Sequence, residues 1–297
     1  MPHEYCAQRP RPSPGASSLF PKQWKSHSVH LPSLQSYLSS SVRDGHQSDL
    51  LLEAELLLLS FATGIQDATT YPDYQCFASN QTGNTVLFAV GVAGLGGSLF
   101  SLRTVGVSLG TFIAGCYLMG QIGNLCGPRK RLWLLITNAV QTALVFAAVG
   151  IQWSVRSSGS DSIAMVVITL LAVSSGAQVA MARPLNIPQI TTAMATAAYV
   201  DLLVDPHLHS LHNRHRNRRL CFLLMLAAGS FVGAFAHSRV NSAFALLLSA
   251  VGKSIVTVLF FFNASDECMG ADSWMTTRNY NRGSNEEQAQ TEASSMS

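Results

Sequence analysis

Hydrophobic residues of this chain gather into eight segments between residues 50 and 262, separated by short polar stretches. Six of these segments approach or exceed the roughly 20 apolar residues that a membrane-spanning helix needs. The other two are shorter and open on polar or small residues. The eight segments, in order, are 50–70, 82–97, 102–123, 132–152, 163–181, 191–204, 220–236 and 241–262. This pattern predicts an all-α, multi-pass membrane protein.

Composition supports this class. Of the 297 residues, 48% are hydrophobic and 12% are charged, against about 25% charged in a typical soluble domain. The six cysteines are scattered without paired spacing, so neither a disulfide framework nor a metal site is indicated. The HExxH, Walker A and strand-associated GxGxxG motifs are missing, and we expect neither an enzyme nor a bound cofactor.

Both ends of the chain are polar. Residues 1–49 are rich in Ser, Pro and basic side chains, which predicts a disordered cytoplasmic tail. Residues 263–297 predict a second disordered polar tail. The expected membrane domain is therefore 50–262.

The distribution of Lys and Arg favours one topology for this domain. If all eight segments cross, the short loops divide their basic residues six to five between the two sides. If 82–97 and 191–204 enter and leave on the same side, the division becomes eight to three. Because cytoplasmic loops are enriched in Lys and Arg, we expect six spanning helices, two short re-entrant helices and both termini in the cytoplasm.

The two halves of the domain, about 50–153 and about 161–262, also resemble each other. Gly64-Ile65-Gln66 reappears 112 residues later as Gly176-Ala177-Gln178. A GxxxG pair at Gly106 and Gly110 matches Gly229 and Gly233. Three spans in each half predict that the second half is inverted relative to the first, as in many transporters. The GxxxG pairs permit close helix packing within the chain or between two copies in a homo-oligomer.

The stretch 64–85 combines the features of a site. It holds Asp67 at the end of an apolar segment, then Asn80-Gln81-Thr82-Gly83-Asn84-Thr85 at the start of the next. An ionisable residue at membrane depth is costly, and is either functional or caps backbone amides. Polar groups at the start of a re-entrant helix either bind a ligand or satisfy the open backbone.

These residues resemble the YoaK-like family of multi-pass membrane proteins. The resemblance rests on Gly64-x-x-Asp67-Ala68 and the Thr-Gly-Asn entry, with a second-half match from Gly176-x-Gln178 and Thr191-Thr192. It covers roughly 52–262. In the second half, Val179 and Ala195-Thr196 stand where the family usually has Asn and Thr-Gly. The resemblance implies an architecture without a settled activity.

Two further groups of residues have open interpretations. Asp201 and Asp205 are spaced to share a helix face, where they either bind a proton or a cation or form a solvated face toward nearby arginines. A run of histidines and arginines at 207–219 is typical of a basic cytoplasmic loop that touches anionic lipid, with metal binding and pH sensing as the alternatives. Its position beside a membrane segment argues against a nucleic-acid partner.

The function that we expect is secondary transport of a small polar or anionic solute. The alternative is a non-transporting membrane scaffold whose tails recruit partners. Which membrane holds the protein is not indicated. The expected substrate-binding residues are Gln66, Asp67, Thr82, Gly83, Asn84, Thr85, Gln178, Thr191 and Thr192.

Overall fold

The computed structural model describes residues 46–97, 99–154, 161–210 and 212–262. The predicted C-terminal tail and residues 1–45 of the predicted N-terminal tail lie outside these ranges. The described residues contain helices and no strand, as the hydrophobic pattern predicts. The elements are α2 (His46–Tyr74), α3 (Gln81–Val92), α4 (Leu102–Cys126), α5 (Arg131–Ser154), α6 (Asp161–Ala182), η1 (Arg183–Leu185), α7 (Ala195–Leu203), α8 (Arg214–Arg239) and α9 (Ser242–Phe262).

Within the described ranges, five helices are long and apolar enough to cross a membrane: α4, α5, α6 with η1, α8 and α9. Large apolar side chains on them face outward, for example Leu125, which is 87% exposed, and Phe231, which is 66% exposed. Such side chains suit a hydrocarbon surrounding. The chain is thus a multi-pass integral membrane protein. The exact six-span, two-re-entrant layout stays a prediction.

Helix α2 differs from these five helices in its charged residues. Its 29 residues give a length of about 43 Å at 1.5 Å per residue, more than a bilayer core requires. However, α2 carries Glu53, Glu55, Asp67 and Asp73, and it is not among the five apolar candidates.

The two short segments form the short helices α3 and α7. At α3, the Asn80 side chain accepts a hydrogen bond from the backbone amide of Gly83 at 3.3 Å. This N-cap satisfies one of the open amides of the first turn. Helices α3 and α7 have 12 and 9 residues, which at 1.5 Å per residue is about 18 Å and about 14 Å. Both are too short to cross a hydrocarbon core of about 30 Å.

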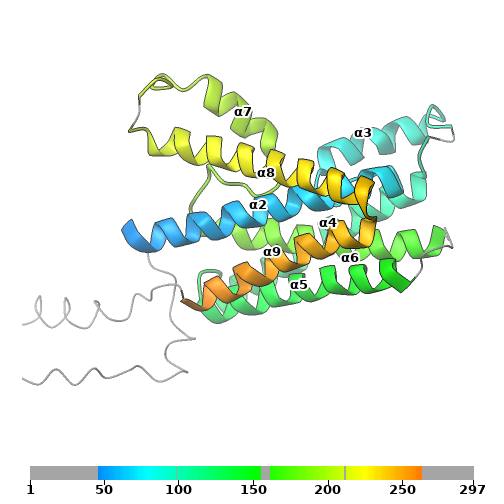
Figure 1. Cartoon of the computed structure of the whole chain (residues 1–297), viewed down its shortest axis with the longest axis horizontal. Helices are drawn as coiled ribbons and strands as arrows, with labels where there is room; N and C mark the ends of the chain where they lie inside the picture. Colours follow the sequence, from blue (N-terminus) through cyan, green and yellow to red (C-terminus); the bar gives the residue numbers. More distant parts are fainter. Residues whose placement is uncertain (1–45, 98, 155–160, 211, 263–297) are drawn as a thin grey trace, which may run out of the picture. The chain divides into compact units, whose positions relative to one another are not determined.

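The long helices pack as a bundle of neighbouring pairs (Figure 1). Helix α2 lies against α8 and α9, whereas α6 lies against α4 and α5. Helices α5 and α9 contact each other and join the two groups. The short helix α3 packs on α4, and α7 packs on α8.

Glycines set the closest contacts of this bundle. A Cβ atom on Gly64 of α2 would lie 2.2 Å from the carbonyl oxygen of Leu226 in α8. A Cβ atom on Gly176 of α6 would lie 2.3 Å from the carbonyl oxygen of Phe112 in α4. Since real side chains do not approach backbone this closely, both helix pairs need glycine there.

The two GxxxG pairs have different surroundings. Gly229 and Gly233 lie against the backbone of α2, at Phe61 and Ile65. Gly106 instead faces the ring of Phe88 in α3, and a Cβ on Gly110 would have nothing within 4 Å. The match between the two pairs therefore does not reflect equivalent packing. In α4 it is Gly115 that meets a backbone, at Val173 of α6.

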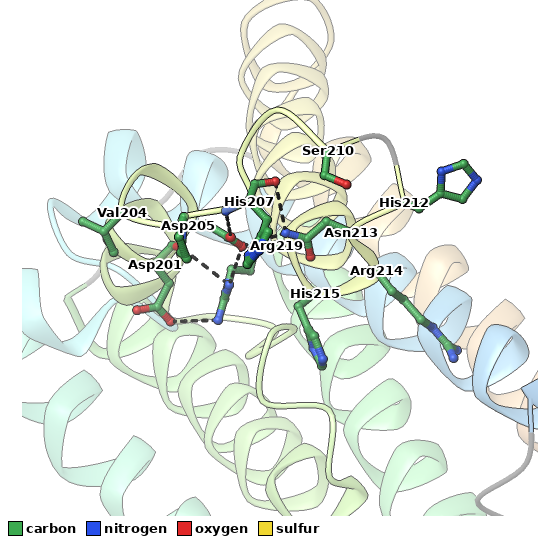
Figure 2. A pocket seen from close by; sticks show the side chains of 11 residues that line it. Asp201, Val204, Asp205, His207, Ser210, His212, Asn213, Arg214, His215 and Arg219 are labelled. Carbon is green, nitrogen blue, oxygen red and sulfur yellow. Dashed lines mark hydrogen bonds and ion pairs between the residues drawn. The ribbon is translucent and has the colours of Figure 1, made fainter.

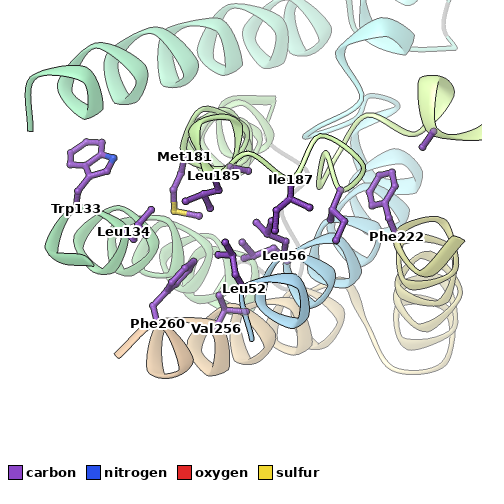
Figure 3. Close-up of a cluster of buried hydrophobic side chains, with 14 of the residues drawn as sticks. Leu52, Leu56, Trp133, Leu134, Met181, Leu185, Ile187, Phe222, Val256 and Phe260 are labelled. Atoms are coloured by element: carbon purple, nitrogen blue, oxygen red, sulfur yellow. The ribbon is translucent and has the colours of Figure 1, made fainter. Parts of the chain in front are cut away.

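Buried apolar side chains form two clusters. One, drawn in Figure 3, joins the first half of α2 and the first turn of α5 to the ends of α6 and α9, with Leu52, Leu134, Met181 and Phe260 among its members. We call it the first cluster. The second cluster joins the latter part of α5 to the first halves of α6 and α9, through Val145, Ile168 and Leu246. Polar residues occupy the part of the bundle between them.

Candidate functional site

Four helices contribute buried polar side chains to one layer of the bundle, which we call the central polar layer. Along α5, α6 and α9 most of these residues fall between the members of the two apolar clusters, and Ser249 lies beside Ala250 at the edge of the second cluster. All seven are at most 3% exposed. They are Thr63 and Gln66 of α2, Gln141 of α5, Ser175 and Gln178 of α6, and Ser249 and Lys253 of α9.

The two glutamines that the sequence singled out lie in this layer. Gln66 donates from Nε2 to Ser249 Oγ at 2.8 Å, and its Oε1 accepts from Ser175 Oγ at 3.4 Å. Gln178 donates from Nε2 to Thr63 Oγ1 at 2.9 Å. Each glutamine therefore bonds to a hydroxyl on the helix that carries the other.

Lys253 is the cation of the layer. Its ammonium donates to Gln178 Oε1 at 2.5 Å and to Gln141 Oε1 at 3.1 Å, and the residue is 0% exposed. Within the described residues no carboxylate lies within 4.0 Å of it. A buried cation normally has an anionic partner, because amide dipoles only partly replace water.

A second set of bonds ties the backbone of α9 to α5 next to Lys253. Asn138 Nδ2 donates to Thr257 Oγ1 at 2.7 Å and to the carbonyl oxygen of Lys253 at 3.3 Å. Thr142 Oγ1 lies 3.3 Å from the same Thr257 hydroxyl. These bonds hold the turn of α9 that presents Lys253 to the layer.

Asp67 lies outside the central polar layer, near the C-terminal end of α2, and its carboxylate reaches into the connection between α2 and α3. Its carboxylate accepts from the Ser79 amide at 2.8 Å and from the Ser79 hydroxyl at 2.5 Å. This geometry matches the capping interpretation, in which Asp67 fixes the chain just before α3.

The Thr-Gly-Asn entry contributes one inward-facing side chain. Asn84 is 0% exposed; it accepts from the Phe77 amide at 2.9 Å and donates to the Phe77 carbonyl at 2.7 Å. Gly83 packs against the Phe77 ring. Thr82 and Thr85 are exposed, and the Thr85 hydroxyl bonds within its own helix. The Asn84 side chain thus holds the backbone of Phe77 in the connection before α3.

A serine of α4 completes this clamp and explains one enzyme-like pattern. Residues 106–110 read G-x-S-x-G, a spacing used by serine hydrolases at a strand-to-helix turn. Here Ser108 lies inside α4, donates to the Phe77 carbonyl at 2.7 Å and accepts from Asn84 at 3.1 Å. The structural context of a nucleophile is therefore not present at Ser108.

Thr191 and Thr192 lie in the connection before α7. Thr191 lines a cavity of about 310 Å³ beside η1, and its hydroxyl caps the Met194 amide at 3.2 Å. Thr192 is 0% exposed and has a φ of 60°, and its hydroxyl has no hydrogen-bond partner among the described residues. The nine predicted site residues therefore occupy three places: the layer, the α3 entry and the α7 entry.

Sequence reasoning missed Lys253, the central cation. Its signal was present, because Lys253 is the single charged residue of the apolar segment 241–262. An isolated charge in a spanning segment indicates a functional site. Gln141 gave no comparable signal, because it is an uncharged residue in the apolar segment 132–152, which also contains other polar residues such as Asn138.

The charges that follow α7 and open α8 are largely paired. Glu53 of α2 accepts from Arg214 at 2.6 Å and from Arg218 at 2.5 Å. Arg219 lies 3.6 Å from both Asp201 and Asp205 (Figure 2). Since α7 ends at Leu203, Asp205 is beyond the helix, and the two carboxylates face an arginine as one interpretation expected.

A cavity of about 690 Å³ adjoins these pairs, with His207, His212 and His215 along its wall. Hydrogen bonding from the His207 amide lowers the pKa of Asp205, assisted by the Asn213 amide and the charge of Arg219 and only partly opposed by burial. Figure 2 shows His212 pointing away from the carboxylates. In the part of the chain that the structure describes, no three His, Cys, Asp or Glu side chains are placed to hold a metal ion.

Comparison with known proteins gives one match. The family described as "Protein of unknown function (DUF1275)" matches residues 56–259, which contain the central polar layer and both short helices. No curated protein and no solved structure matches the chain. The family match is consistent with the resemblance to YoaK-like proteins. Because the match spans more than half of the chain, this multi-pass membrane protein belongs to the DUF1275 family.

Proposed function

We propose that this protein is a secondary transporter or permease of a small polar solute, and that the solute is an anion bound at Lys253. The observation that carries the proposal is a buried cation with amide partners alone, enclosed between two apolar clusters. An anion entering the layer supplies the missing charge and competes with Gln141 and Gln178 for the ammonium. The apolar clusters keep water and ions from crossing the resting layer.

We infer an inverted repeat, which would support alternating access, from the contacts between the α-helices. Exchanging α2 with α6, α3 with α7, α4 with α8 and α5 with α9 turns each observed contact between two of these α-helices into another observed contact. The same exchange turns the hydrogen bond Thr63–Gln178 into the hydrogen bond Ser175–Gln66. Ser175 lies 112 positions after Thr63, and Gln178 lies 112 positions after Gln66. Two similar halves that meet at a central site can rock against each other.

The residues of the two halves can also be aligned by the residues that precede their short helices. Asn80 precedes α3 and Met194 precedes α7, an offset of 114. The same offset relates Gly115 to Gly229, the two glycines that approach a neighbouring backbone. On this alignment the Thr-Gly-Asn entry corresponds to Thr196-Ala197-Ala198, so the polar clamp of the first half has an apolar counterpart.

In this proposal the apolar clusters are the two gates. Opening the first cluster exposes Lys253 on the side of the paired arginines, which the charge distribution predicts to be cytoplasmic. Opening the second exposes it on the other side. Asp67 and Asn84 hold α3 in place against α4, and Gln66 and Gln178 orient the layer. The layer thus replaces Asp67 as the centre of the expected site.

A thermal-shift panel followed by uptake tests this function. Purified protein is heated with chloride, nitrate, formate, acetate, lactate, phosphate or sulfate, at constant ionic strength. An anion that raises Tm is then offered to protein in liposomes, with empty liposomes and Lys130→Met, an exposed lysine, as controls. Selective uptake by wild type and Lys130→Met supports transport. A stable protein that binds and moves none of the anions favours the scaffold alternative.

A further inference from the structure

Arg183, at the end of α6, is a second cation without a carboxylate partner. It is exposed, and in the described residues no acidic side chain lies within 4.0 Å of it. Its Nη2 contacts the Met194 sulfur at 3.4 Å. A thioether is a weak acceptor, so the guanidinium keeps most of its capacity to bind an anion.

Two cavities meet at this arginine. The cavity of about 310 Å³ described above has Arg183 and Val179 in its wall, together with Asn186 and Thr191. A second cavity, of about 350 Å³, also has Arg183 and Val179 in its wall. Arg183 therefore lines two cavities, and each of them also has polar side chains in its wall.

The second cavity has a polar part and an apolar part. Asn124 and Gln121 provide amides, whereas Met119 and Gly120 of α4 and the ring of Trp133 provide apolar surface. A Cβ on Gly120 would meet nothing within 4 Å, so the groove is open above this glycine. Next to it, the side chains of Leu118 and Ile122 on α4 are 55% and 42% exposed. The groove thus continues onto a surface that faces lipid.

The corresponding place at the end of α2 is filled. Residues 67 and 71 lie 112 positions before Val179 and Arg183. There, Asp67 bonds Ser79, and Tyr71 stacks on Phe77 with ring centroids 4.8 Å apart. The end of α6 lacks both contacts and has cavities instead.

We propose that this site binds the head group of an anionic phospholipid, with the phosphate at Arg183 and an acyl chain along α4 over Gly120. Three features select an amphiphile over a soluble anion: a guanidinium that has no carboxylate partner among the described residues, the amides beside it, and the apolar groove that leads to the outer face of α4. Trp133 in the wall suits the membrane interface, where tryptophan is enriched. The site is separate from the central polar layer, and it stands whether or not the layer transports an anion.

Native mass spectrometry of the full-length protein in detergent tests the proposal. The probes are phosphatidylserine, phosphatidylcholine and inorganic phosphate. We expect phosphatidylserine to remain bound at one site per chain and phosphatidylcholine to be lost. We expect Arg183→Gln to bind phosphatidylserine about tenfold more weakly, as for removal of one charge-assisted contact. Arg239→Gln, which changes an exposed arginine at the far end of α8, should bind as wild type does.

Gly120→Leu provides an independent variant, because it fills the groove and leaves Arg183 in place. It should also weaken phosphatidylserine binding, with an unchanged Tm in the absence of lipid. Equal retention of both lipids, undiminished binding by Arg183→Gln or Gly120→Leu, or displacement of the lipid by millimolar phosphate would each overturn the proposal. The last result would assign a soluble anion to Arg183 instead.

Discussion

The ammonium of Lys253 donates to Oε1 of Gln178 at 2.5 Å, and both residues are fully buried, 75 positions apart in sequence. Gln178 belongs to α6 and Lys253 to α9, so this bond joins helices that lie in the same half of the sequence. The same glutamine reaches Thr63 of α2 in the other half. Gln178 therefore links both halves to the cation.

Replacing Gln178 by leucine should destabilise the protein. The change removes one of the two acceptors of Lys253 and the donor to Thr63, and leaving buried polar groups unsatisfied costs about 1–3 kcal/mol each. Thermal unfolding in detergent measures the effect. Gln121→Leu, at an exposed glutamine of α4, is the matched control and should change Tm little. Equal effects of the two changes would contradict the assigned role of Gln178.

The close helix contacts predict a difference between glycines. Gly64→Ala and Gly176→Ala place a methyl group 2.2 Å and 2.3 Å from a carbonyl oxygen of the neighbouring helix. The helices must then move apart, and we expect a loss of about 1–3 kcal/mol in unfolding free energy. Gly150→Ala is the control, since its Cβ would meet nothing within 4 Å. That change should be neutral or stabilise by up to about 1 kcal/mol.

Asp67 and Ser79 should act as a structural pair. Asp67→Ala removes the acceptor of the Ser79 amide and hydroxyl and should increase hydrogen exchange in the turn before α3. Asp67→Asn keeps an acceptor and should have a smaller effect. If Asp67→Asn abolishes anion uptake while exchange in this turn stays as in wild type, Asp67 has a direct role in transport, as the sequence first suggested.

The turn at Asp205 predicts a pH dependence. Because the folded state lowers the pKa of Asp205, the unfolded state binds the proton more readily, and the stabilisation exists above the ordinary carboxyl pKa of about 4. It is lost as the pH falls through the lowered pKa of the folded state. The Tm difference between wild type and Asp205→Asn should therefore be largest near pH 7 and shrink toward pH 3. A difference that grows on acidification would contradict this assignment.

Much of the fold followed from the hydrophobic pattern. The expected segment 102–123 became Leu102–Cys126, and 132–152 became Arg131–Ser154. Helix boundaries next to polar residues were less accurate: the segment 82–97 ends as a helix at Val92, where Gly94 adopts a φ of 73°. Apolar composition continues past that turn, so periodicity alone could not locate it.

The site was only partly predictable, because its contacts join distant positions. Gln66 and Gln178 were identified through the repeated Gly-x-Gln pattern, but the partner of Gln66, Ser249, lies 183 residues away. Asp67 and Asn84 were identified as polar groups at the ends of apolar segments. Their bonds to Ser79 and Phe77 are local, and only the structure shows that they fasten a turn.

Uptake of the anion found in the thermal-shift panel, compared between wild type and Lys253→Met in liposomes, tests the central claim most directly. Methionine keeps the length and apolar volume of the side chain and removes its charge. We predict that Lys253→Met inserts, stays folded and loses uptake, whereas Lys130→Met transports as wild type does. Uptake by Lys253→Met at the wild-type rate would contradict the assignment of Lys253 as the anion-binding group.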